Sequence, residues 1–163
     1  MKIYKDYILR KIKIEEIDKL QDLFPGNNEL WLKYREKRMK ELENLESEIF
    51  VAEYNNDFIG EITVNYTNHN LTTETIPNKR VYFEAFRIKK TFQGKRLGQA
   101  LFKYVLKHLE ENGYIEFTIG VEADNLIAKH IYNKLGFTEI IDKGYGDEFD
   151  SSDYDLYLRR KEL

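Results

Sequence analysis

The spacing of apolar and polar residues predicts a chain in which strands and helices follow one another closely. Residues 7–14 are strand-like, and apolar positions at three-residue intervals then predict a helix over 14–24. A longer and more polar helix is predicted over 28–46. The apolar runs 48–54 and 58–66 are separated by Asn-Asn-Asp, residues that tolerate left-handed backbone angles, which predicts a β-hairpin.

The middle of the chain has the pattern of a strand, a helix and a second strand. Residues 80–88 form a nearly continuous apolar run, which is typical of a strand covered on both faces. One apolar stripe over 97–109 predicts an amphipathic helix that ends at Gly113, and 115–121 then alternate as a strand. A strand, a helix and a strand in succession imply a right-handed crossover between parallel neighbours.

The last part of the chain predicts a short helix and two more strands. Asp124 is the expected N-cap of a helix that has Ile127, Ile131 and Leu135 on one face and ends at Gly136. Strands at 137–141 and 154–160 complete the order β-α-α-β-β-β-α-β-α-β-β. The predicted fold class is therefore α/β of the mixed kind, with a mostly antiparallel twisted sheet, a central parallel pair and helices on both faces.

Composition narrows the class of protein further. The 163 residues suit one domain, and 26 basic against 29 acidic residues, a formal charge of −3, argue against duplex nucleic acid as a partner. Neither a membrane-spanning run nor a signal-like amino end is evident, so a cytoplasmic protein without a membrane partner is expected. With no cysteine and three histidines, no metal is expected, and the chemistry must use oxygen, nitrogen and backbone groups.

The stretch "QGKRLG", residues 93–98, predicts an anion site. It lies where a buried strand ends and a helix begins, so unpaired N–H groups and the positive end of the helix dipole face the loop. Gly94 and Gly98 let the backbone approach a phosphate, and Lys95 and Arg96 add positive charge. The alternative is a solvated basic pair at the start of an ordinary helix. The pattern is neither a P-loop nor a dinucleotide fingerprint.

Two motifs resemble the GNAT superfamily of acetyl-coenzyme A dependent N-acetyltransferases: "FRIKKTFQGKRLGQALFKYVLKHLEENGY" and "IGVEADNLIAKHIYNKLGFTEI". The predicted order of elements resembles that family's fold over essentially the whole chain, as a single domain. The family's phosphate loop, Gln/Arg-x-x-Gly-x-Gly/Ala, aligns with Gln93, Gly94, Lys95, Arg96, Leu97 and Gly98. Arg96 replaces the middle glycine, and we expect this to be tolerated if residue 96 has helical angles.

The resemblance also implies how acetyl-coenzyme A would bind as co-substrate. Backbone groups of Phe86 to Ile88 would bind the pantetheine arm, and the parallel strands 80–88 and 115–121 would splay apart to admit the thioester. Asn125 resembles the family's cofactor-side asparagine, although it could only support the helix cap. Tyr132 resembles the family's general-acid tyrosine, although it could be a packed aromatic residue.

The general base is predicted to be Glu84, since it is the only acid inside the apolar run 80–88 and burial would raise its pKa. Two alternatives stay open: Glu84 pairs with Arg87 or Arg80, or a water relay removes the proton. The chemistry would be direct attack of an amine on the thioester, with a backbone N–H near Ile88 stabilising the oxyanion.

The acceptor is the part of the function that the sequence defines least. Five acids and no base occur in the run 147–155, which the resemblance places beside the acceptor opening: Asp147, Glu148, Asp150, Asp153 and Asp155. A small cationic amine is therefore the expected acceptor partner, with a solvated acidic turn as the alternative. Two rival functions remain: a non-catalytic acyl-coenzyme A binding module and a peptide or protein amino-terminal acetyltransferase. A homodimer is also left open.

Overall fold

The computed structural model describes residues 2–4, 6–146, 149 and 152–161. Two compact units make up the chain: Met1–Val64 with Ala85–Leu109, and Asn65–Glu84 with Glu110–Leu163. We call them the first and the second unit. Strand β5, Arg80–Ile88, passes from the second unit into the first between Glu84 and Ala85.

The first unit contains strands in the order β1-β2-β3-β4-β5. Antiparallel ladders join β1 to β2 and β2 to β3. Its elements are β1 (Lys2–Tyr4), β2 (Tyr7–Lys11), η1 (Ile14–Leu23), α1 (Asn28–Glu43), β3 (Ser47–Tyr54), β4 (Asp57–Asn65), the end of β5 and α2 (Leu97–Glu111). The short strand β1 was not predicted from the sequence.

Local sequence explains several of these elements. The three-residue spacing of Ile17, Leu20 and Leu23, all buried, matches a 3-10 helix, and η1 is one. Asn55 and Asn56 have φ of 49° and 66°, as the predicted turn between β3 and β4 requires.

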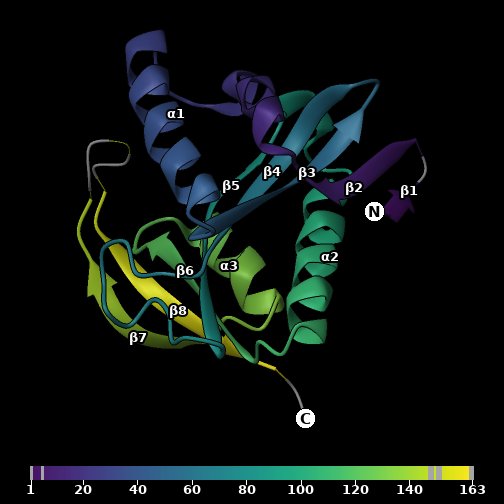
Figure 1. Ribbon diagram of the computed structural model, residues 1–163. Coiled ribbons are helices and arrows are strands. Elements are labelled where there is room, and N and C mark those ends of the chain that lie inside the picture. Colours follow the sequence, from purple (N-terminus) through teal and green to yellow (C-terminus); the bar gives the residue numbers. More distant parts are fainter. Residues whose placement is uncertain (1, 5, 147–148, 150–151, 162–163) are drawn as a thin grey trace. The chain divides into compact units, whose positions relative to one another are not determined.

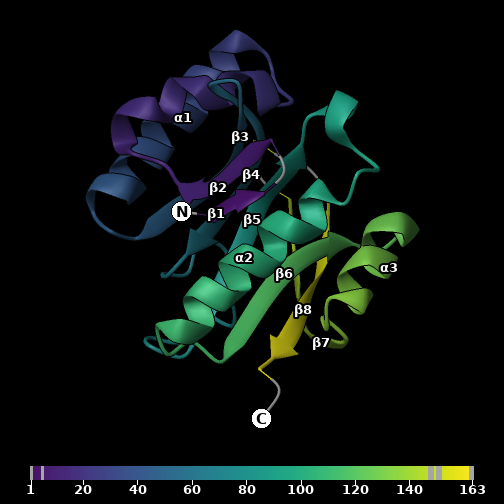
Figure 2. The ribbon, with the colours of Figure 1, turned by 90° about the vertical axis from the view of Figure 1, so that its right-hand side faces the viewer.

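Helices lie on both faces of the strands of the first unit. Figure 1 shows α1 and α2 on opposite sides of β3 and β4, and Figure 2 shows α2 in front of these strands. Phe50 of β3 contacts α2 through the rings of Tyr104 and His108, at 6.3 and 5.2 Å between centroids. On the α1 side, Phe24, Trp31 and Tyr34 form an aromatic cluster with centroid distances of 4.9 to 5.9 Å.

The second unit contains strands in the order β5-β6-β8-β7. They are the start of β5, β6 (Glu116–Glu122), β7 (Glu139–Gly144) and β8 (Tyr154–Arg160), with helix α3 (Leu126–Lys134). β5 and β6 are parallel, and β8 is antiparallel to both β6 and β7. Phe83, Phe117 and Phe137 are fully buried and form its aromatic core, with the first two rings stacked at 5.9 Å. The predicted fold class, a mixed sheet with one parallel pair, is confirmed.

Strand β5 changes in backbone conformation, pairing and burial near Ala85, whose φ is +54°. Its parallel ladder with β6 runs only from Arg80 to Phe83, paired with Glu116 to Ile119. Val81, Tyr82 and Phe83 are buried, whereas residues 84–88 are half-buried. The prediction of a strand covered on both faces therefore holds for its first half only.

In the parts of the chain that the structure describes, no helix has both the length and the apolar character needed to cross a bilayer.

Candidate active site

The loop 93–98 has the geometry of an anion-binding turn in the first unit. Gln93, Gly94, Lys95 and Arg96 are exposed, and the first hydrogen bond of α2 runs from the Ala100 N–H to the Arg96 carbonyl at 3.1 Å. The N–H groups before Ala100 are therefore the orphan donors of a helix amino end. Left-handed backbone at residues 94 and 96, with φ of 76° and 62°, is the kind of turn in which N–H groups converge on an anion.

Arg96 corrects one expectation from the sequence. We expected the missing glycine to be tolerated if this position had helical angles, but its φ of +62° is left-handed and α2 begins only at Leu97. A non-glycine residue costs about 1–2 kcal/mol in this conformation. The family pattern has its middle glycine at this position. The left-handed backbone that favours glycine is therefore present here, although the residue is arginine.

Gly98 allows the first turn of α2 to lie close to β5. A Cβ atom added to Gly98 would be 3.1 Å from the Phe86 ring and 3.4 Å from the Ile88 side chain. Leu97 beside it is buried. Gly98 therefore serves helix–strand packing, and a substitution there perturbs the sheet as well as the loop. A Cβ added to Gly94 would meet nothing within 4 Å, so the other glycine faces open space.

Gln93 connects the loop to the strand. Its Nε2 donates to the Ile88 carbonyl at 3.0 Å, and the Lys89 N–H donates to the Ile59 carbonyl of β4 at 2.8 Å. The Phe86 ring lies edge-on to Phe102 of α2 at 5.3 Å. The side chain of Gln93 thus holds the end of β5, and the Ile88 carbonyl that we expected to face a ligand already accepts one hydrogen bond.

Asn125, in the second unit, is the N-cap of α3. Its Oδ1 accepts from the Ala128 N–H at 3.1 Å, whereas we predicted Asp124 as the cap. The extended or bridging backbone that a cap needs falls one residue later than the sequence suggested. The oxygen of this exposed side chain caps the helix, so Nδ2 is the atom that remains as a candidate donor to a ligand.

Tyr132 lies on α3 and is half-buried. Its ring is edge-on to Phe137 at 6.2 Å, and its carbonyl accepts from the Phe137 N–H. Burial raises the pKa of Tyr132 to about 12. The phenol therefore keeps its proton at neutral pH, which a proton donor requires.

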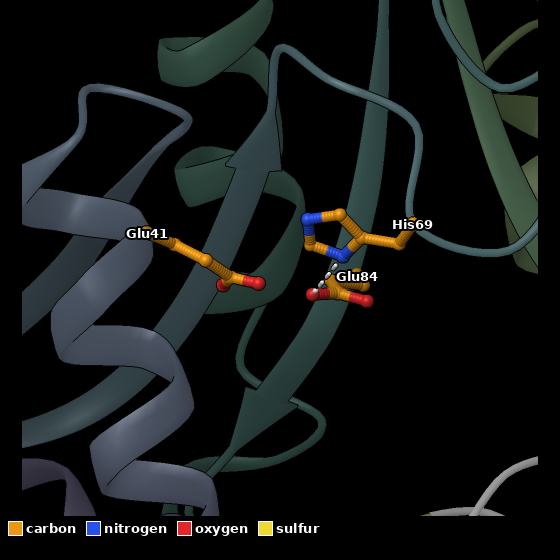
Figure 3. Close-up of side chains that lie close together, drawn as sticks. All are labelled: Glu41, His69 and Glu84. Atoms are coloured by element: carbon orange, nitrogen blue, oxygen red, sulfur yellow. Dashed lines mark ion pairs between the residues drawn. The ribbon is translucent and has the colours of Figure 1, made fainter.

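Glu84 faces a histidine that the sequence did not single out. Its Oε1 is 3.5 Å from Nδ1 of His69, which belongs to the loop between β4 and β5 (Figure 3). The arginines that we considered as its partners are engaged elsewhere: Arg80 with Glu116 at 3.0 Å and Arg87 with Glu61 at 3.8 Å. His69 was missed because a lone histidine in a polar loop, fifteen residues from Glu84, carries no pattern.

Glu61 on β4, a buried acid, was also missed. It is 1% exposed, and neither of its carboxylate oxygens has a hydrogen-bond partner among the described residues. Burial raises its pKa to about 7, against the opposing charges of Arg87 and Arg38. Arg87 in turn lies over the rings of Phe24 and Tyr34, at 5.6 and 5.8 Å.

The structure describes only part of the acidic run 147–155. Asp147, Glu148 and Asp150 lie outside the described residues. Asp153 is exposed and Asp155 is half-buried at the start of β8. The role of the run at an acceptor opening stays a prediction.

Comparison with known proteins identifies the family. Residues 14–137, more than half of the chain, match the model of the acetyltransferase (GNAT) family. The chain belongs to this family. A 46-residue stretch is 48% identical to mycothiol acetyltransferase from Catenulispora acidiphila, but it spans 28% of this chain and only 15% of that protein.

Solved structures share the fold at low sequence identity. A PaiA N-acetyltransferase from Thermoplasma acidophilum in complex with coenzyme A is 18% identical, with a TM-score of 0.66 over 94% of this chain and 98% of that one. A chimera of the Vibrio cholerae spermidine N-acetyltransferase is 15% identical, with a TM-score of 0.72 over 96% of each chain. A ribosomal-protein alanine N-acetyltransferase from Escherichia coli is 14% identical, with a TM-score of 0.71 over 96% of this chain and 95% of that one.

Proposed function

We propose that the protein transfers an acetyl group from acetyl-coenzyme A to a primary amine by direct attack in a ternary complex. The observation that carries this proposal is the loop 93–98, where orphan N–H groups, two left-handed residues and two exposed cations surround the start of α2. In a member of an acetyltransferase family, a phosphate-bearing co-substrate is the anion that suits this loop.

The first unit is proposed to hold the co-substrate. The N–H groups around Gly94 and Gly98 would bind the pyrophosphate, and Lys95 and Arg96 would add charge at its edge. The left-handed φ of Ala85 interrupts β5 after its ladder with β6 has ended at Phe83, so the backbone from Phe86 to Ile88 is suited to pairing with the amide-bearing pantetheine arm. In the second unit, Nδ2 of Asn125 is the proposed further contact.

The second unit is proposed to supply the proton transfers. The acceptor amine loses a proton to Glu84, directly or through water, and its nitrogen then attacks the thioester carbonyl. A C–N bond forms, the C–S bond breaks, and the acylated nitrogen releases a second proton to water, which balances the proton that the thiolate receives. Tyr132 gives its phenolic proton to the departing thiolate, and its pKa, raised by burial, favours the protonated phenol at neutral pH. The Glu84 carboxylate lies 3.5 Å from Nδ1 of His69, whose charge when protonated would favour the ionised form of Glu84.

The test is release of free coenzyme A from acetyl-coenzyme A in the presence of a panel of primary amines and short peptides. Thiol release that depends on both substrates supports the proposal. Binding of acetyl-coenzyme A without release by any amine or peptide would instead indicate a binding module. Release with peptides alone would indicate a peptide or protein amino-terminal acetyltransferase; the Escherichia coli neighbour is named as a ribosomal-protein-S18-alanine N-acetyltransferase.

Two variants separate binding from chemistry. Lys95→Ala should weaken coenzyme A binding measured by calorimetry. Glu84→Gln should leave that binding unchanged and lower turnover, since only the proton acceptor is removed. A variant Glu84→Gln with full turnover would leave the water relay as the remaining route for the proton.

A further inference from the structure

The second unit contains a polar cluster that the proposed mechanism does not use. We call it the Glu74 cluster: Asn70 and Glu74 of the loop between β4 and β5, Tyr82 of β5 and Tyr154 of β8. Glu84 lies beside it, two residues from Tyr82 on the same face of β5. Burial raises the pKa of Tyr82 and of Tyr154, and the charges of Glu74 and Glu84 add to this effect. Two carboxylates and two phenols from three segments thus gather at one place.

Glu74 is the most buried member of the cluster, and only one of its two carboxylate oxygens accepts hydrogen bonds within the described part of the chain. It is 0% exposed, and its Oε1 accepts from the N–H groups of His69 at 2.7 Å and Asn70 at 3.1 Å. Its Oε2 is buried and has no hydrogen-bond partner within the described part of the chain. An unpaired buried carboxylate oxygen is costly, because the group has lost its water.

The loop that carries Glu74 is fixed in place. Thr118 of β6 donates its hydroxyl to the Glu74 carbonyl at 2.8 Å, and Nη1 of Arg80 donates to the Thr73 carbonyl at 2.8 Å. Thr73 itself donates to Asp142 of β7 at 2.6 Å. The unpaired oxygen of Glu74 is therefore held in position by its surroundings on both sides.

The ring of Tyr154 is held equally closely. A Cβ atom added to Gly120 of β6 would be 2.7 Å from this ring, and one added to Gly144 of β7 would be 2.1 Å from it. Two glycines inside strands therefore leave room for one tyrosine, although glycine weakens a strand. Nδ2 of Asn70 donates to the Tyr154 hydroxyl at 2.9 Å, and the hydroxyls of Tyr82 and Tyr154 are hydrogen-bonded to each other.

The cluster has more acceptors than donors. The two phenols have two hydroxyl protons, of which one lies in the bond between them, and the other does not reach Oε2 of Glu74. Burial raises the pKa of Glu74, against its backbone hydrogen bonds and the charge of His69, so a positive charge brought beside it would favour its ionised form. A ligand that completes this cluster must bring N–H donors and positive charge.

Exposure indicates the side from which such a ligand arrives. Glu74 is 0% and Tyr82 8% exposed, whereas the Glu84 side chain is 23% exposed and Tyr154 is half-buried. Glu74 and Tyr82 are therefore the inner residues of the cluster, and solvent reaches Tyr154 and the neighbouring Glu84.

We propose that the Glu74 cluster binds the ammonium group of the acceptor, with Oε2 of Glu74 and the phenols of Tyr82 and Tyr154 as its hydrogen-bond acceptors. An ammonium group has three N–H donors and one positive charge, which match the unmet demand. The inference rests on the proposed acetyl transfer and gives it an acceptor class: a primary amine that arrives as a cation and lies beside Glu84, which then takes its proton.

The test is calorimetric titration of n-butylamine, with n-butanol as its neutral analogue, into protein saturated with coenzyme A. The variants are Glu74→Gln, whose amide oxygen can keep the two backbone hydrogen bonds, and Tyr154→Phe, which keeps the ring between its glycines. Tyr145→Phe is the matched control, because this tyrosine is 72% exposed and lies near the cluster only through its backbone carbonyl.

We expect saturable binding of n-butylamine and not of n-butanol. Glu74→Gln and Tyr154→Phe should each weaken n-butylamine binding about ten-fold or more, as expected for lost hydrogen bonds to a charged group. Tyr145→Phe should bind as wild type does, and coenzyme A affinity should not change in any variant. If Glu74→Gln fails to fold, Tyr154→Phe alone decides, since it removes only a hydroxyl.

Three results would overturn the inference: equal binding of n-butanol, no saturable binding of n-butylamine, or wild-type affinity in both variants. Each is separable from failure of the proposed function. If wild-type protein still releases coenzyme A with amines, acetyl transfer stands and only the place of the ammonium is wrong. If no amine or peptide gives release, the transfer itself fails.

Discussion

Replacing Glu61 by glutamine should change the way in which stability depends on pH. Glu61 has an ordinary pKa of 4.5 in the unfolded chain and about 7 in the folded chain, because burial removes water from its carboxylate. Arg87 Nη1 is 3.8 Å away, too far for a hydrogen bond, so its charge offsets only part of that cost. The folded protein therefore keeps a proton on Glu61 that the unfolded chain has already lost.

The sign and size of the effect follow from linkage. Between pH 4.5 and about 7 the folded state binds more protons than the unfolded state, so the free energy of unfolding falls as the pH rises through this window. The difference of about 2.5 pKa units corresponds to roughly 3 kcal/mol at 1.36 kcal/mol per unit. This contribution is fully present below pH 4.5 and is lost above about pH 7.

Urea unfolding followed by circular dichroism at pH 5, 6, 7 and 8, at constant ionic strength, measures the effect. Glutamine does not titrate, so the free energy of unfolding of Glu61→Gln minus that of wild type should increase toward pH 8, by roughly 2–3 kcal/mol over this range. Any cost of the amide that does not depend on pH cancels in this comparison. Glu43→Gln on α1, which removes an exposed carboxyl, is the matched control. The reasoning fails if the difference for Glu61→Gln varies with pH no more than the difference for Glu43→Gln.

Three other predictions concern the loop and the proposed acid. Arg96→Gly should raise the free energy of unfolding by about 1 kcal/mol, because glycine tolerates the left-handed φ, yet weaken coenzyme A binding by calorimetry; unchanged binding would remove Arg96 from the phosphate site. Gly98→Ala should cost about 1–3 kcal/mol in urea unfolding, since its methyl would lie 3.1 Å from the Phe86 ring, and a neutral effect would show that α2 shifts easily. Tyr132→Phe should lower turnover by about 100-fold or more with coenzyme A affinity unchanged. Full turnover in Tyr132→Phe would mean that the ring serves packing alone. Because the pKa of Tyr132 is about 12, ionisation of its phenol should not lower wild-type turnover below about pH 11.

The order of elements could be predicted because each element has a local signature. The three-residue spacing in η1, the two left-handed asparagines between β3 and β4, and Gly113 and Gly136 with φ of 95° after two helices are all visible in the sequence. At these positions the backbone preference of each residue and the burial of one face favour the same element, so the element can be predicted from the sequence.

Contacts between distant segments could not be predicted in the same way. The approach of His69 to Glu84 and of Tyr154 to Gly120 and Gly144 depends on how loops and strands pack, and neither pair has a periodic signal. The partner of Glu84 was therefore assigned to nearby arginines, which ion pairs elsewhere had already engaged. One-residue offsets, such as a cap at Asn125 in place of Asp124, are the usual uncertainty of helix ends.

Two residues in the segments proposed to bind the co-substrate have a left-handed backbone that their side chains disfavour; Leu45, just after α1, is a further residue of this kind outside those segments. Ala85 and Arg96 both adopt a positive φ that glycine would adopt at less cost, one just before Phe86 and the other just before α2. Neither conformation is explained by burial, since Ala85 is half-buried and Arg96 is exposed. Strain of this kind persists only where the surrounding structure imposes it, and it is concentrated at ligand sites. The backbone requirements at these two positions therefore support a ligand-binding role for 85–98 independently of the charges of Lys95 and Arg96.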